Sequence, residues 1–207
     1  SGSQTVSFND PSSGSSCFAH LELTNTGTVT FATGVVVTED IVNNLSSEPV
    51  NVTNLYPAGT ATFNLGLSNE GEWPWDLAPY ENWTLAQDIN IDGNFYLLAN
   101  CTIDSSGHTM NIGGGFYQRQ GTFNVNGSTI NIAGDYIIEK ADGNNANAIL
   151  QMTNADDHII VEGNFLMNSS WSHSDKLTEG ILEIKGDFTE KYDSHSSSTY
   201  TNFQATG

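Results

Sequence analysis

A short pattern that recurs at nearly constant spacing is the feature that most constrains the fold of this chain. Each copy reads apolar, any, apolar, any, Gly, then Asn, Asp or Gly, then an aromatic residue. The copies are Ile89–Phe95, Met110–Phe116, Ile130–Tyr136, Ile159–Phe165 and Leu182–Phe188. Their glycines lie at positions 93, 114, 134, 163 and 186, which gives steps of 21, 20, 29 and 23 residues. A repeat of this length is typical of architectures in which similar units stack on one another.

The pattern predicts an all-β chain folded as a single-stranded parallel β-solenoid (β-helix) with coils of about 20 residues. Alternating apolar and polar residues are typical of strands with one buried face. We expect the Gly-Asn and Gly-Asp pairs to supply residues that take positive φ and turn the chain sharply. The alternative is an antiparallel β-sandwich, which also has short strands and turns but no reason to repeat one corner signature.

The chain is expected to form one solenoid domain over residues 1–207, in three parts. Residues 1–42 form N-terminal coils, residues 43–82 an irregular Pro/Trp-rich insertion or cap, and residues 83–207 the regular coils. The middle part contains four of the five prolines and breaks the period. The 29-residue step predicts an inserted loop at 141–148. The last residues followed by the first continue an alternating pattern, so we expect one unit of a tandem array, continuous with neighbouring repeats.

The strongly acidic composition excludes whole classes of partner. Lys and Arg number 5 against 24 Asp and Glu, which gives a formal charge of -19. A nucleic-acid partner is excluded because backbone phosphates need a basic footprint. No apolar run is long enough for membrane insertion, and anionic membrane surfaces repel such a chain. The composition favours a secreted or cell-surface location in a salty, calcium-containing medium.

The two cysteines, Cys17 and Cys101, lie 84 positions apart and fit no zinc pattern. They either form a disulfide or remain separate, small and apolar. The alternation of Cys101 with Ile103 favours separate buried thiols.

The most distinctive aromatic residues gather around the irregular middle part of the chain. Trp73, Trp75, Tyr80 and Trp83 are candidates for a carbohydrate-binding platform, because exposed rings stack on the apolar faces of sugars. The alternative is that these rings cap an end of the solenoid and shield its edges.

Catalysis on a polysaccharide, which some parallel β-helices perform, needs a basic residue or a cluster of carboxylates. Arg119 follows Phe116 and Tyr117 and is better explained as a solvated side chain beside aromatics on an outer face. Asp88, Asp92 and Asp104 lie on neighbouring coils and are better explained as turn residues that accept hydrogen bonds from backbone amides. The sequence therefore favours a non-enzymatic protein, with a polysaccharide-degrading enzyme as the less favoured alternative.

No cofactor is required by any motif, and calcium is the metal with the best case. Asp142, Asp156 and Asp157 are the candidate calcium ligands, because carboxylates in loops suit hard cations. No EF-hand spacing or Gly-Gly-x-Gly-x-Asp repeat accompanies them, and the five histidines match no zinc signature.

The tracts Trp83–Phe95, Gly107–Ile112 and Trp171–Phe188 resemble repeat segments of very large bacterial surface proteins, the adhesin-like β-solenoids with filamentous-haemagglutinin-like architecture. The resemblance covers most of the chain from about residue 83 onward. It implies an extracellular fibre or stalk and carries no catalytic residues with it. The expected function is a structural or adhesive module that meets a glycan or a host-surface partner, with a carbohydrate-binding module as the alternative.

Overall fold

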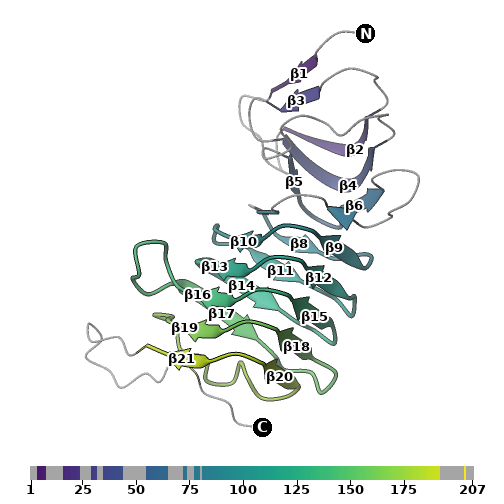
Figure 1. The fold of residues 1–207 in the computed structure, drawn as a ribbon. Coiled ribbons are helices and arrows are strands. Elements are labelled where there is room, and N and C mark those ends of the chain that lie inside the picture. Colours follow the sequence, from purple (N-terminus) through teal and green to yellow (C-terminus); the bar gives the residue numbers. More distant parts are fainter. Residues whose placement is uncertain are drawn as a thin grey trace.

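The computed structural model describes residues 4–7, 16–23, 29–31, 35–43, 55–64, 72–73, 77–79, 81–191 and 203. All regular elements among these residues are β-strands, and every strand pair is parallel (Figure 1). The strands stack into a β-solenoid of about six turns with roughly 21-residue spacing. This confirms the predicted fold class and excludes the antiparallel sandwich. The described residues contain no helix with the length and hydropathy that crossing a membrane requires.

Three parallel sheets run along the regular part of the stack, and successive coils add strands to each of them (Figure 1). The first sheet consists of β8 (Trp83–Thr84), β11 (Thr102–Asp104), β14 (Gln120–Asn124) and β17 (Asn147–Gln151). The second consists of β7 (Glu72–Trp73), β9 (Ile89–Ile91), β12 (Met110–Ile112), β15 (Thr129–Ile132), β18 (His158–Val161) and β20 (Ile181–Ile184). The third consists of β10 (Phe95–Leu97), β13 (Phe116–Gln118), β16 (Tyr136–Ile138), β19 (Phe165–Met167) and β21 (Phe188–Glu190).

The N-terminal part forms further parallel strands. A pair consists of β1 (Gln4–Val6) and β3 (Val29–Phe31), and a four-stranded sheet consists of β2 (Cys17–Leu23), β4 (Val35–Asn43), β5 (Leu55–Pro57) and β6 (Thr62–Asn64). Two of these strands, β5 and β6, and also β7 fall within the expected insertion at 43–82. Strands β5 and β6 both pair with β4, and β7 pairs with β9. The described residues of that region therefore take part in the stack. Of the chain ends that suggested a tandem array, the structure describes residues 4–7 and 203.

Equivalent apolar residues of successive coils form ladders inside the stack. One ladder runs through the third sheet and consists of Phe95, Phe116, Tyr136, Phe165 and Phe188. Its first four rings are fully buried, and neighbouring centroids lie 4.5 to 5.6 Å apart. In the second sheet, β9, β12 and β15 have Ile or Met at both inward positions, as the alternation predicted. The aromatic residue of the repeat therefore serves the core.

The repeated glycines are required by close packing between coils. None of the glycines of the five repeat copies has positive φ, so the expected backbone role is wrong for them. Instead, the backbone nitrogen of Gly134 donates to the carbonyl of Gly114 at 2.9 Å, and a Cβ on Gly134 would lie 2.9 Å from the same oxygen. The Asn or Asp that follows links coils: Asn94 Oδ1 accepts from the amide of Gly115, and Asp135 Oδ1 from that of Asn164.

Positive φ occurs at a different corner, between the first and second sheets. Ser106 and Gly107 both have positive φ there, and Asn126 and Gly127 repeat the arrangement one coil later. Two consecutive residues of positive φ match a type I′ turn, which favours Asn-Gly. The second alternating run of each coil ends at this corner.

The long 29-residue step is accommodated by a loop that leaves the stack, as predicted. Residues 139–146 connect β16 to β17 and project from the side of the solenoid (Figure 1). The loop is closed by hydrogen bonds from Lys140 N to Asn144 O and from Gly143 N to Lys140 O, both 3.0 Å. β17 then rejoins β14 in register, so the insertion does not shift the ladders.

No disulfide joins Cys17 and Cys101, which confirms that they stay separate; Cys101 is buried and Cys17 is half-buried. Burial raises the pKa of the Cys101 thiol to about 11, and the nearby charge of Glu81 adds to the effect.

Cys101 is therefore expected to resist alkylation in the folded protein. At about pH 8, roughly one Cys101 thiol in a thousand is ionised, and only the thiolate reacts. Mass spectrometry after iodoacetamide treatment should show alkylated Cys101 in urea and none without urea. Equal alkylation rates in the two conditions would contradict the burial of the thiol.

The same pKa shift predicts a pH dependence of stability. The thiol ionises at lower pH in the unfolded chain than in the folded protein, so the contribution of Cys101 to stability falls as pH rises from 9.0 toward about 11.

Candidate ligand-binding surface

The predicted aromatic platform is not formed as expected, because Trp83 belongs to the core. Its side chain is only 1% exposed, and its Nε1 donates a hydrogen bond to the carbonyl of Ala61 at 3.0 Å. The assignment of Trp83 to a sugar-binding surface is therefore wrong. The backbone of Trp73 pairs with Ile91 in the second sheet. Trp75 and Tyr80 lie outside the described residues.

The three candidate calcium ligands do not come together. Asp142 is exposed in the loop between β16 and β17, whereas Asp156 and Asp157 lie in the turn between β17 and β18. Asp157 is buried, and its carboxylate accepts from the amides of Gly127 at 2.5 Å and Asn154 at 3.0 Å. In the described part of the chain, no group of three or more His, Cys, Asp or Glu side chains is arranged to hold a metal ion.

Asp157 is expected to be a structural residue, unlike its neighbour Asp156. Asp157→Ala leaves two amides without their acceptor and should lower the free energy of unfolding by about 2–3 kcal/mol. Asp156→Ala, at an exposed position, should change it by less than about 0.5 kcal/mol. Urea titrations of both variants, with and without calcium, test this. Equal losses, or a calcium-dependent stability that both variants abolish, would show a joint metal site instead.

The carboxylates considered for catalysis also serve turns. Asp88 Oδ1 accepts from the amide of Thr109 at 2.8 Å, and Asp104 Oδ1 accepts from that of Ser106 at 2.8 Å. Both contacts confirm the structural interpretation of these residues. The Asp88 contact links its coil to the next one, and the Asp104 contact stabilises its own turn.

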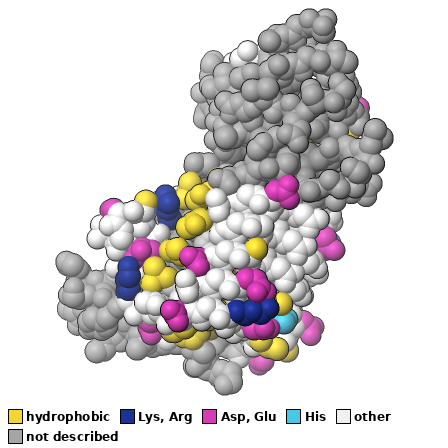
Figure 2. Space-filling view, in the orientation of Figure 1, with side chains coloured by type: hydrophobic (Ala, Val, Ile, Leu, Met, Phe, Trp, Pro, Cys, Tyr) yellow, Lys and Arg dark blue, Asp and Glu magenta, His cyan; other side chains and the backbone are white. Residues whose placement is uncertain are grey.

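The outer surface of the third sheet carries an apolar column that the sequence pattern did not single out. Tyr96, Tyr117, Ile137 and Leu166 occupy equivalent outward positions on β10, β13, β16 and β19, and all four are half-buried. The rings of Tyr96 and Tyr117 stack with centroids 5.1 Å apart. The guanidinium of Arg119 lies 6.0 Å from the centroid of the Tyr96 ring, which confirms its predicted place beside aromatics. Figure 2 shows hydrophobic side chains on this surface with cationic side chains beside them.

A cleft of about 390 Å³ opens beside this column, where the loop 139–146 leaves the stack. Its lining residues are Leu98, Arg119, Gln120, Lys140, Ala141 and Asp142. Arg119 lies at the corner between β13 and β14, and its backbone is fixed on both sides. Its amide donates to Leu97 O at 2.9 Å and its carbonyl accepts from Asn147 N at 3.2 Å. The cleft therefore has one wall in the rigid stack and one in the projecting loop.

The cations of the cleft differ in their pairing from Lys185 and Lys191 but not from Lys176, which forms no ion pair with a described carboxylate either. Lys185 forms an ion pair with Glu162 at 2.6 Å, and Lys191 pairs with Glu139. Among the residues that the structure describes, no carboxylate forms an ion pair with Arg119 or Lys140. Hydrogen bonds from Asn144 lower the pKa of the Asp142 carboxyl, and the charge of Lys140 adds to this effect. Asp142 is thus ionised, but both of its oxygens already accept from Asn144.

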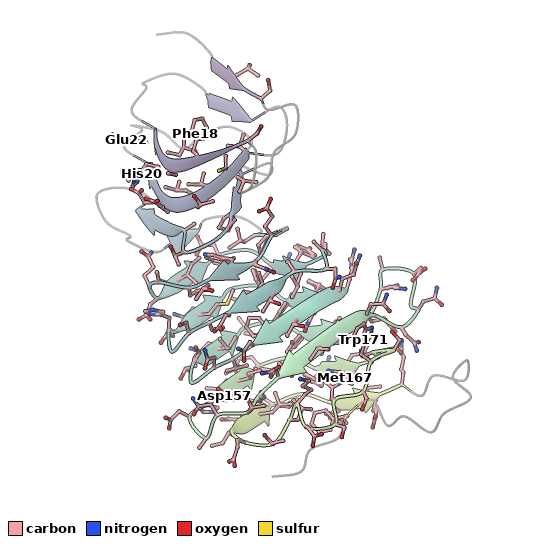
Figure 3. The ribbon with its side chains drawn as sticks, turned by 180° about the vertical axis from the view of Figure 1, so that it is seen from behind. Phe18, His20, Glu22, Asp157, Met167 and Trp171 are labelled. Carbon is pink, nitrogen blue, oxygen red and sulfur yellow. The ribbon has the colours of Figure 1, made fainter. Side chains whose placement is uncertain are left out.

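An exposed tryptophan lies further along the same side of the stack. Trp171 is 53% exposed and follows Ser170 in the loop after β19. The Ser170 hydroxyl donates to Asn147 Oδ1 at 2.7 Å, and Asn147 pairs with Gln120 in the first sheet. Figure 3 shows Trp171 on the side of the solenoid from which the loop 139–146 projects. The sequence placed Trp171 in a loop, but gave no sign that this loop lies two coils from Gln120.

Comparisons of the chain with protein-family models, with curated proteins and with solved structures found no match.

Proposed function

We propose that the chain is a non-enzymatic, extracellular structural and adhesive module, whose stacked coils extend and present a surface. A place in a larger bacterial surface protein of the filamentous-haemagglutinin-like kind is part of this proposal, and the sequence resemblance described above supports it. The acidic composition supports a secreted or cell-surface location.

The observation that carries the proposal is the unbroken register of the coils. Parallel pairing continues through five strands of the third sheet and six of the second, and the 29-residue step does not interrupt it. In such a stack each coil is held by both neighbours, so stability and stiffness accumulate with length. A closed ladder core with short turns also leaves few sites at which a protease can bind.

The placement of the polar side chains supports a structural role. Asn90, Asn111 and Asn131 form a ladder on the outer surface of the second sheet, with hydrogen bonds of 2.6 and 2.7 Å between neighbouring amides. The acidic residues at the corners accept hydrogen bonds from backbone amides of their own turn or of an adjacent coil, as Asp135 and Asp157 do. These side chains connect one coil to the next.

A digestion assay and an activity assay together test the proposal. Under limited proteolysis the region 81–191 should remain one folded body, with any nick confined to the loop 139–146. Incubation with uronate-containing and neutral polysaccharides should release no new reducing ends and no unsaturated products. Polysaccharide cleavage that is lost when an aspartate of the stack is replaced by Asn would contradict the non-enzymatic role. Antibodies against the chain should label intact cells of the source; labelling only after permeabilisation would contradict the location.

A further inference from the structure

We propose that the cleft between Arg119 and Lys140 binds the carboxylate of an acidic saccharide, a uronic acid unit of a glycan chain that extends along the stack toward Trp171. This goes beyond the structural role, because a rigid module need not bind any saccharide on its side. It assigns a ligand class and a site to the adhesive part of that role.

The charge distribution is the first argument. The chain has 24 acidic and 5 basic residues, so a cation on its surface has many carboxylates to pair with. Lys185 and Lys191 do so, whereas Lys176, Arg119 and Lys140 form no ion pair with a described carboxylate. Of these three, Arg119 and Lys140 line the same cleft. The stacked backbone and the Tyr96 ring hold Arg119 in place. Asp142 lines the same cleft and interacts with the charge of Lys140, but both of its oxygens accept hydrogen bonds from Asn144. Two cations in one cleft without an ion pair can therefore take an external anion, and a guanidinium favours a planar carboxylate.

The shape and the remaining lining are the second argument. The cleft is shallow and open, with a volume of about 390 Å³, so a saccharide segment can lie in it with one face toward solvent. Leu98 gives the cleft an apolar patch, and the exposed amide of Gln120 offers both a donor and an acceptor for sugar hydroxyls. An apolar patch surrounded by hydrogen-bonding and cationic groups matches the amphipathic surface of a uronic acid.

The position of Trp171 is the third argument, and it indicates the direction in which the bound saccharide chain runs. Gln120, Asn147 and Ser170 lie at equivalent places on successive coils. With strands spaced about 4.8 Å apart, Trp171 lies about 10 Å along the axis from Gln120. A half-exposed tryptophan is a typical contact residue, because its ring is large, rigid and amphipathic. A saccharide chain parallel to the axis reaches both the cleft and this ring.

Calorimetric titration with tetrasaccharides of galacturonic, glucuronic and mannuronic acid tests the proposal. At least one probe should bind the full chain saturably. Arg119→Gln and Lys140→Gln should each weaken that binding about tenfold, as expected for a lost charge-assisted hydrogen bond. Trp171→Ala should weaken it about fivefold. Lys185→Gln removes the same charge from the second sheet and should leave the affinity unchanged. Circular dichroism and thermal unfolding confirm that each variant folds.

NMR chemical-shift mapping of the backbone amides in the unmodified protein is a second test that does not depend on any variant. Adding the bound probe should shift the amides of Leu98, Arg119, Gln120, Lys140 and Trp171, and leave those of the second sheet in place. The proposal is overturned if none of the three probes binds, or if a neutral galactose tetrasaccharide or an acidic peptide binds as tightly. It is also overturned if Lys185→Gln weakens binding as much as Arg119→Gln. A protease-resistant chain that fails these tests would keep its structural role and lose only the saccharide site.

Discussion

Replacing Gly121 by alanine is expected to lower the free energy of unfolding by about 3–5 kcal/mol, one of the largest effects available to a single methyl group. Gly121 has a φ of 69°, which L side chains rarely adopt. A Cβ at this position would lie 2.3 Å from the carbonyl oxygen of Cys101 and 2.7 Å from that of Ala99. Both atoms belong to the backbone of the preceding coil, so the clash can be relieved only by separating two stacked coils.

Gly107 provides the matched control for this prediction. Its φ of 82° is just as unfavourable for alanine, but a Cβ there meets nothing within 4 Å. Gly107→Ala should therefore cost only the backbone strain, about 1–2 kcal/mol. Urea unfolding followed by circular dichroism gives both values. Similar losses in the two variants would mean that Gly121 does not pack against the preceding coil as described.

The second large effect is expected at the buried hydrogen-bond network of Gln118 and Tyr136. The Tyr136 hydroxyl donates to Gln118 Oε1 at 2.7 Å, while Gln118 Nε2 donates to the carbonyls of Ile149 at 2.8 Å and Gly121 at 3.2 Å. Both side chains are fully buried, and burial raises the pKa of Tyr136 well above its usual value. Gln118→Leu fits the space but leaves the buried hydroxyl without its acceptor, so we expect a loss of about 2–4 kcal/mol.

A double-mutant cycle separates this network from simple loss of packing. Tyr136→Phe should cost about 1–2 kcal/mol in the wild-type background and clearly less in the Gln118→Leu background. The coupling energy, measured by urea unfolding of the four proteins, should therefore be at least about 0.5 kcal/mol. Additive losses would show that the hydroxyl and the amide do not depend on each other. A Gln118→Leu variant more stable than the wild type would contradict the network itself.

The repeated pattern predicted the architecture and most of the core, because both follow from local periodicity. The aromatic residues and the alternating Ile and Met residues lie inward, at the positions that a period of two requires. The role of the repeated glycines was predicted wrongly for a physical reason. Positive φ and close packing between coils both select glycine, and only the contact of Gly134 with Gly114 separates the two explanations.

The candidate site could not be predicted, because it depends on contacts between coils. Arg119 and Lys140 meet at one cleft only because the 29-residue step forms a loop there and then restores the register. Gln118 occupies a position where neighbouring coils have Leu97 and Ile138, so its network with Tyr136 gives no signal in the pattern. Trp83 was misassigned because a tryptophan near prolines and other aromatics gives no information on its exposure, and here it fills the core.

The central claim, one rigid stack of coils in register, is tested most directly by hydrogen exchange of individual amides in the full chain. The amides of Ile91, Ile112, Ile132 and Val161 lie in adjacent strands of the second sheet. We predict slow exchange at all four, with protection that disappears together as urea is added, because each coil is stabilised by its neighbours. Exchange of any of these amides at the rate of an unfolded chain, or loss of protection coil by coil in low urea, would contradict a rigid module.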